Sequence, residues 1–115
     1  LLFFSANDGT NGTELWESNG TGNGTVQVAN ISPTSSSSTP RYLSNVNGTL
    51  FFQATDPTNG TELWTSNSIG ATLVANLNAA GADADPRFLA NANGKLFFSA
   101  DDGKHGRQLF FVTGV

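Results

Sequence analysis

Residues 2–19, LFFSANDGTNGTELWESN, return almost unchanged at residues 50–67 as LFFQATDPTNGTELWTSN. The two stretches agree at 14 of 18 positions, and a third copy begins at Leu96. The starts are therefore separated by 48 and then by 46 residues. A fixed period of this length indicates tandem structural units. The chain divides into unit 1 (residues 1–48), unit 2 (residues 49–94) and the first half of unit 3 (residues 95–115).

The sequence of each unit predicts four short strands. In unit 1, residues 2–6 form an apolar run typical of a strand covered on both faces, followed by Asp-Gly and Asn-Gly pairs typical of a hairpin turn. Residues 13–18 are the predicted return strand, and residues 25–31 alternate apolar and polar side chains. After a serine-rich loop at 32–39, residues 40–46 form a fourth strand, whose initial proline predicts a position at a sheet edge.

Four strands in about 47 residues is the period of a β-propeller blade. The predicted fold class is all-β, with tandem four-stranded antiparallel units of propeller-blade type, 2.5 of them in the chain. Propellers close with roughly 4 to 8 blades. We therefore expect the chain to be a piece of a longer array, to complete a ring with other copies of itself, or to stack into a filament.

The composition excludes several classes of protein. The chain has a net charge of -4 and no basic stripe, so nucleic acid is not an expected partner. It contains no cysteine, which excludes a disulfide framework and a thiolate metal site. No apolar run approaches the roughly 20 residues of a membrane span.

The pattern LFFSAxDGxxGxELWxSxGT over residues 2–21 resembles the ELWxxDGT repeat family of secreted and surface bacterial proteins, also described as hyalin-like or adhesion repeats. The resemblance covers the whole chain. Three departures are Asn19 and Asn67, where that family usually has Asp, and Pro57, which replaces a turn glycine. The resemblance implies a propeller-like, extracellular or cell-surface module without catalytic activity or a required cofactor. We expect a structural or adhesive role through the assembled surface.

Trp16 and Trp64 stand at the same position of units 1 and 2. Adjacent residues of a strand face opposite sides, so Leu15 and Trp16 can both be core if the sheet is covered on both faces. The third unit has Phe110 at this position, which favours core packing. In the alternative interpretation, the tryptophans stack on sugars and the protein is a carbohydrate-binding β-propeller lectin that binds surface glycans, with about two sugar sites per chain.

Charged residues also recur in the units. Glu14 and Glu62 precede the tryptophans, and Arg41 and Arg87 begin the fourth strands. A repeated Glu–Arg pair would tie strands within or between blades. A pair of carboxylates for glycoside hydrolysis is not reproduced, because the third unit has Gln108 at the position of the glutamates.

The hairpin turns contain carboxylates that could bind Ca²⁺ with low affinity. The candidate ligands are Asp8, Asp56, Asp101 and Asp102. Each of the first two is the only carboxylate in its loop, so plain turn chemistry explains the same residues.

His105 is the only histidine of the chain, and it occupies the turn position of Asn11 and Asn59. A position that accepts Asn and His predicts a left-handed backbone in a turn rather than a catalytic base.

Six asparagines begin an Asn-x-Ser/Thr sequence and are possible N-glycan acceptors: Asn11, Asn19, Asn23, Asn30, Asn47 and Asn59. Most of these sequences are Asn-Gly-Thr, which also suits a tight turn followed by a strand. The acceptors would be used only in a cell that glycosylates exported proteins.

Overall fold

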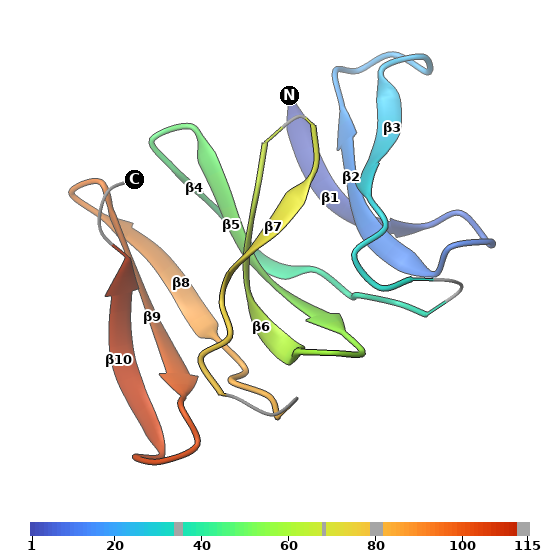
Figure 1. Cartoon of the computed structure of the whole chain (residues 1–115). Helices are drawn as coiled ribbons and strands as arrows, with labels where there is room; N and C mark the ends of the chain where they lie inside the picture. Colours follow the sequence, from blue (N-terminus) through green and yellow to red (C-terminus); the bar gives the residue numbers. More distant parts are fainter. Residues whose placement is uncertain (34–35, 68, 79–81, 113–115) are drawn as a thin grey trace.

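The computed structural model describes residues 1–33, 36–67, 69–78 and 82–112. Ten strands in these residues form three antiparallel sheets, which stand side by side (Figure 1). The all-β prediction is confirmed. No described segment forms a helix with the length and hydrophobicity that crossing a membrane requires. The strands are β1 (Leu2–Asn7), β2 (Thr13–Ser18), β3 (Thr25–Ala29), β4 (Arg41–Val46), β5 (Thr49–Asp56), β6 (Gly60–Ser66), β7 (Ala71–Ala75), β8 (Arg87–Ala92), β9 (Lys95–Asp101) and β10 (Arg107–Val112).

The sheets are displaced by one strand from the sequence repeat. Sheet 1 has the order β1-β2-β3, sheet 2 the order β4-β5-β6-β7, and sheet 3 the order β10-β9-β8. Strand β4, the fourth strand of sequence unit 1, is therefore hydrogen-bonded to β5 of unit 2. It forms an edge of sheet 2, as its preceding proline predicts.

Two-residue turns explain this displacement. Asn47 and Gly48 join β4 to β5 with φ angles of 52° and 85°, and Asn93 and Gly94 join β8 to β9 with φ angles of 53° and 78°. Positive φ at both central residues is the type I′ geometry, which fits the twist of a hairpin and favours Asn-Gly. The turn therefore pairs the fourth strand of one unit with the first strand of the next.

The core fills the spaces on both sides of sheet 2. Because side chains alternate along a strand, Phe51 of β5 faces sheet 3 while Phe52 faces sheet 1. Each of the two residues belongs to one of two buried clusters. The cluster towards sheet 3 contains Val46, Phe51, Leu63, Ala84, Leu96, Phe98 and Ala100. The cluster towards sheet 1 contains Leu15, Ile31, Leu50, Phe52, Ala54 and Trp64.

The prediction that the first apolar run is covered on both faces holds for sheet 2 and fails for sheet 1. Strand β5 is buried on both faces, because sheets 1 and 3 flank it. Strand β1 has the same sequence pattern, but Leu2 is exposed. The difference is one of neighbours, since no described residue covers the outer face of sheet 1 as sheet 1 covers sheet 2.

Candidate functional site

Each of the two junctions between sheets is built around a buried glutamate. Glu14 of β2 is fully buried. Its Oε1 accepts a hydrogen bond from the amide of Ile31 at 2.6 Å and from the hydroxyl of Ser38 at 2.9 Å, and its Oε2 accepts from the amide of Ser38 at 3.0 Å. The carboxylate therefore holds both ends of the serine-rich loop against β2.

Glu62 of β6 repeats this arrangement between sheets 2 and 3. It is also fully buried, and its carboxylate accepts hydrogen bonds from the amides of Leu77 at 2.7 Å and Ala84 at 3.0 Å. Burial raises the pKa of Glu62, while these amide hydrogen bonds oppose the rise. Side-chain chemistry on one strand thus fixes the loop that leads to the next sheet.

The loop residue held by each glutamate also bonds to the following sheet. Ser38 donates its amide to the Thr13 carbonyl at 2.9 Å, and its own carbonyl accepts from the amide of Thr55 in β5 at 2.9 Å. Ala84 does the same with the Thr61 carbonyl and the amide of Asp101 in β9. One loop residue therefore connects two sheets at each junction.

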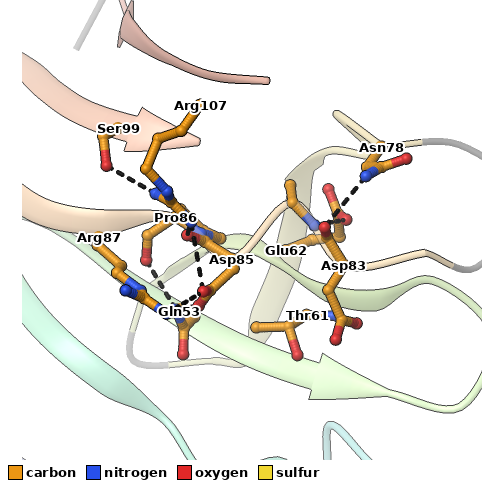
Figure 2. Close-up of polar contacts among 11 residues, drawn as sticks. Gln53, Thr61, Glu62, Asn78, Asp83, Asp85, Pro86, Arg87, Ser99 and Arg107 are labelled. Atoms are coloured by element: carbon orange, nitrogen blue, oxygen red, sulfur yellow. Dashed lines mark hydrogen bonds and ion pairs between the residues drawn. The ribbon is translucent and has the colours of Figure 1, made fainter. Parts of the chain in front are cut away.

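The expected Glu–Arg pairing is not found among the described residues. Arg87 instead pairs with Asp85, which raises the pKa of Arg87. The Asp85 carboxylate also accepts hydrogen bonds from the side chains of Gln53 of β5 and Arg107 of β10 (Figure 2). The carboxylates of Glu14 and Glu62 instead accept hydrogen bonds from backbone amides of the junction loops.

A polar pocket opens beside the second junction. Its volume is about 330 Å³. It lies where sheet 2 meets the segment that precedes β8, and no aromatic side chain lines it. The lining residues are Thr39, Arg41, Gln53, Thr55, Thr61, Asp83 and Asp85.

The two tryptophans differ in burial. Trp64 is 8% exposed and belongs to the cluster between sheets 1 and 2, while Leu63 beside it faces sheet 3. Trp16 is half-buried, on the outer face of sheet 1. The indole Nε1 atoms of both residues are buried without a hydrogen-bond partner in the described part of the chain. The structure does not bring the tryptophans to the polar pocket.

The turn carboxylates accept hydrogen bonds from their own turns. Asp8 Oδ1 accepts from the amides of Thr10 and Asn11, each at 2.8 Å, and Asp56 and Asp102 repeat the arrangement. Asp101 Oδ1 accepts from the amide of Gly103 at 2.8 Å. Residues 1–33, 36–67, 69–78 and 82–112 contain no group of three or more His, Asp or Glu side chains that could hold a metal ion. The low-affinity Ca²⁺ site remains a prediction.

The prediction of a left-handed backbone at Asn11, Asn59 and His105 is wrong, because this conformation occurs one residue later. The following glycines adopt it instead, with φ of 77° at Gly12, 74° at Gly60 and 71° at Gly106. The physical reason is that the asparagine or histidine side chain turns back to the turn carboxylate. His105 Nδ1, for example, lies 2.9 Å from Asp102 Oδ2. Glycine then takes the conformation that disfavours a Cβ atom.

Five of the six possible glycan acceptors lie in turns or at turn ends. Asn19, Asn23, Asn30 and Asn47 are exposed. Asn11 and Asn59 are half-buried, and their Nδ2 atoms donate to Asp8 and Asp56 at 2.7 and 2.9 Å. Glycosylation of all six stays a prediction.

The Asp102 turn makes stability depend on pH. Hydrogen bonds from His105 and from the Lys104 amide lower the pKa of Asp102 below its usual range. A carboxyl with a lowered folded-state pKa contributes stability above its unfolded pKa of about 3.9 and loses it as the pH falls further. We expect Asp102→Asn to reduce the loss of melting temperature between about pH 5 and pH 2.

Lys104→Gln is the control for this substitution, because it changes a charge in the same turn but leaves the carboxylate in place. Its acid dependence should match that of the wild type. Equal acid dependence of the wild type and Asp102→Asn would show that the turn carboxylate does not contribute.

Comparison with known proteins finds no matching family model, no matching curated protein and no matching solved structure.

Proposed function

We propose that the chain is a set of propeller-blade-type repeat units that act as a non-catalytic, extracellular structural or adhesive module. In this proposal the outer faces of the chain pack against further units, either in other copies or in the rest of a longer chain. The resemblance to the ELWxxDGT repeats supports the location and the class. The burial of equivalent residues in sheet 2 is the observation that supports assembly.

The outer face of sheet 3 is apolar, and the sheet 2 equivalents of its residues Leu109 and Phe97 are buried. Leu109 is 73% exposed and Phe111 is 57% exposed, and the Phe111 ring lies 5.7 Å from that of Phe97. The repeat places Leu109 at the position of Leu63 and Phe97 at that of Phe51, which are 1% and 4% exposed against sheet 3. The exposed face therefore has the composition of a face that packs on another sheet.

The outer face of sheet 1 is the counterpart. Leu2, Phe4 and Trp16 stand at the positions of Leu50, Phe52 and Trp64, which sheet 1 covers in the interior. Within the chain, the two types of face meet at both junctions. A sheet 3 face of one copy and a sheet 1 face of another would repeat that contact head to tail.

The edges of the sheets support the same proposal. Strands β1 and β10 are edges of three-stranded sheets, whereas sheet 2 has four strands. Edge strands present unpaired backbone groups that can pair with another chain. Assembly would then combine face packing with strand addition.

The alternative of a lectin that binds sugars through its tryptophans has less support. Trp64 is buried between two sheets, so its ring has little surface to offer a sugar. Only Trp16 keeps a partly accessible ring.

Assembly can be tested by sedimentation of the 115-residue chain over a range of concentrations. The wild type should associate as its concentration rises. We expect Leu109→Lys combined with Phe111→Lys to weaken association by at least about tenfold, because two charges would have to be buried in an apolar contact.

The matched control is Thr10→Lys combined with Thr58→Lys. It adds the same charge at two exposed turn residues whose side chains make no hydrogen bond to the described residues. This control should associate as the wild type does. A wild type that stays monomeric, or an outer-face variant that associates equally well, would contradict assembly through this face.

A further inference from the structure

We infer that the polar pocket at the second junction, rather than the tryptophans, is a binding site for a neutral polyhydroxylated ligand of monosaccharide size. The inference is independent of assembly, because the pocket lies between sheet 2 and the segment that precedes β8, and no residue of the two outer faces lines it.

The strand register brings four of the lining residues to one face of sheet 2. Arg41 of β4 is paired with Gln53 of β5, and Thr55 of β5 is paired with Thr61 of β6. Side chains of directly paired residues point to the same face, as do residues two apart on one strand. Phe51 lies on this face as well, in the buried cluster. The face thus changes from apolar to polar along β5, and the pocket opens at the polar end.

The segment before β8 forms the opposite wall and is held rigidly. Ala84 is anchored by Glu62 and the Thr61 carbonyl. The Gln53 side chain, only 5% exposed, donates from Nε2 to Asp85 Oδ1 at 2.8 Å and to the Pro86 carbonyl at 2.7 Å (Figure 2). Arg107 adds a hydrogen bond to the Asp85 carbonyl at 2.9 Å. The wall is therefore formed before any ligand binds.

Several polar groups of the lining keep hydrogen-bonding capacity. The Arg41 side chain makes no hydrogen bond or ion pair with any residue that the structure describes. Asp83 uses Oδ1 to accept from the Thr61 amide at 2.7 Å, which leaves Oδ2 as an acceptor. The hydroxyls of Thr55 and Thr61 lie 2.7 Å apart, so one donates to the other and the second keeps its proton for a ligand.

This set of groups favours hydroxyls over other ligand chemistry. Arg41 can donate hydrogen bonds and Asp83 can accept them, and a hydroxyl group can bind to either because it is both an acceptor and a donor. An anion would meet the carboxylates of Asp83 and Asp85, and a cation would meet Arg41. A volume of about 330 Å³ lies at the small end of the range of ligand pockets.

Comparison of the two junctions indicates one site in the chain. Gln53, Asp83 and Asp85 stand at the repeat positions of Ser5, Ser37 and Thr39 in the first junction. Ser37 keeps the structural bond of Asp83, since its Oγ accepts from the Thr13 amide at 2.9 Å as Asp83 does from the Thr61 amide. The three residues of the first junction lack the carboxylates and the amide that distinguish the pocket. These three departures from the repeat therefore lie together in the second junction.

The test is an NMR titration of the ¹⁵N-labelled 115-residue chain with D-glucose, D-galactose, D-mannose and N-acetyl-D-glucosamine, each added separately. At least one sugar should shift the amides of Thr55, Thr61 and Asp85 in a saturable manner, with one equivalent bound per chain. Arg41→Ala should weaken this binding by about tenfold or more, because the residue supplies charged donors. Asp83→Asn should also weaken it, while its retained Oδ1 can still accept from the Thr61 amide.

Lys104→Ala is the matched control, because it removes one exposed positive charge outside the pocket and should bind as the wild type does. Spectra of the free variants report whether each has kept its fold. The inference would be overturned if none of the four sugars gave saturable shifts, or if Arg41→Ala bound as tightly as the wild type. Shifts centred on the Trp16 and Trp64 indoles, with two equivalents bound, would overturn it in favour of the tryptophan sites.

Discussion

Glu62→Ala should destabilise the chain by about 2 to 4 kcal/mol, a large part of the free energy of unfolding of a domain of this size. The substitution leaves the part-buried amide of Leu77 without its acceptor, and the buried amide of Ala84 keeps only the Thr61 carbonyl. Each unsatisfied buried donor costs roughly 1 to 3 kcal/mol, and the deleted side chain leaves a cavity in addition. Urea unfolding, followed by tryptophan fluorescence, would measure the change.

The location of the damage is a second observable of the same substitution. Because Ala84 connects sheet 2 to Asp101 of sheet 3, loss of the Glu62 carboxylate should loosen the segment before β8. Hydrogen exchange at the amides of Ala84 and Asp101 should accelerate more than exchange in β1 or β2.

Gln108→Ala provides the control, since Gln108 occupies the same repeat position in β10 and is exposed. Its effect should stay within about 0.5 kcal/mol. If Glu62→Ala were equally mild, the glutamate would not be the element that holds the junction.

The role of these glutamates could not be predicted from local sequence patterns. The bonded partners of Glu14 lie 17 to 24 residues away, and one of them is a single serine in a run of four. Only the three-dimensional path of the loop selects Ser38 for burial. The sequence signal was a glutamate repeated on a strand and replaced by glutamine in unit 3. This signal fits an ion pair with arginine as well as it fits hydrogen bonds to loop amides.

Local features were predictable for a physical reason. The strands follow from the alternation of side chains and the turns from Asn-Gly pairs, and both depend on residues close together in sequence. The Asn47-Gly48 pair forms such a turn. The turn pairs the fourth strand of unit 1 with the first strand of unit 2, so two sequence units share one sheet. A repeat boundary placed at the turn assigns these two paired strands to different units and hides their pairing.

The pocket residues show a different limit. Repeat comparison highlights what two units share, and the shared residues build the sheets and junctions. Gln53 and Asp85 are places where the units differ, so the same comparison passes over them. Subtracting one unit from the other would have marked both residues, although not the loop geometry that brings them within 2.8 Å.

Trp64→Ala should destabilise the chain by about 3 to 5 kcal/mol, whereas Trp64→Phe should cost about 1 kcal/mol or less. The alanine variant leaves a large cavity between sheets 1 and 2, where Trp64 packs with Phe52 and Leu15. The phenylalanine variant keeps most of the apolar contact and removes an indole N–H that has no partner in the described part of the chain. Phe110 already fills the equivalent position in sheet 3.

Substitution of Trp16 tests whether the effect depends on the burial of the tryptophan or only on its position in the repeat. Trp16 has the same repeat position but is only half-buried, so Trp16→Ala should cost about 1 to 2 kcal/mol, clearly less than Trp64→Ala. Chemical unfolding followed by circular dichroism would compare the three variants without depending on the deleted fluorophore. If the two alanine variants were equally destabilised, burial between the sheets would not explain the role of the tryptophan. If Trp64→Phe kept its stability and also the saturable sugar shifts at Thr55 and Thr61, the indole would be a core residue and the pocket the site of recognition.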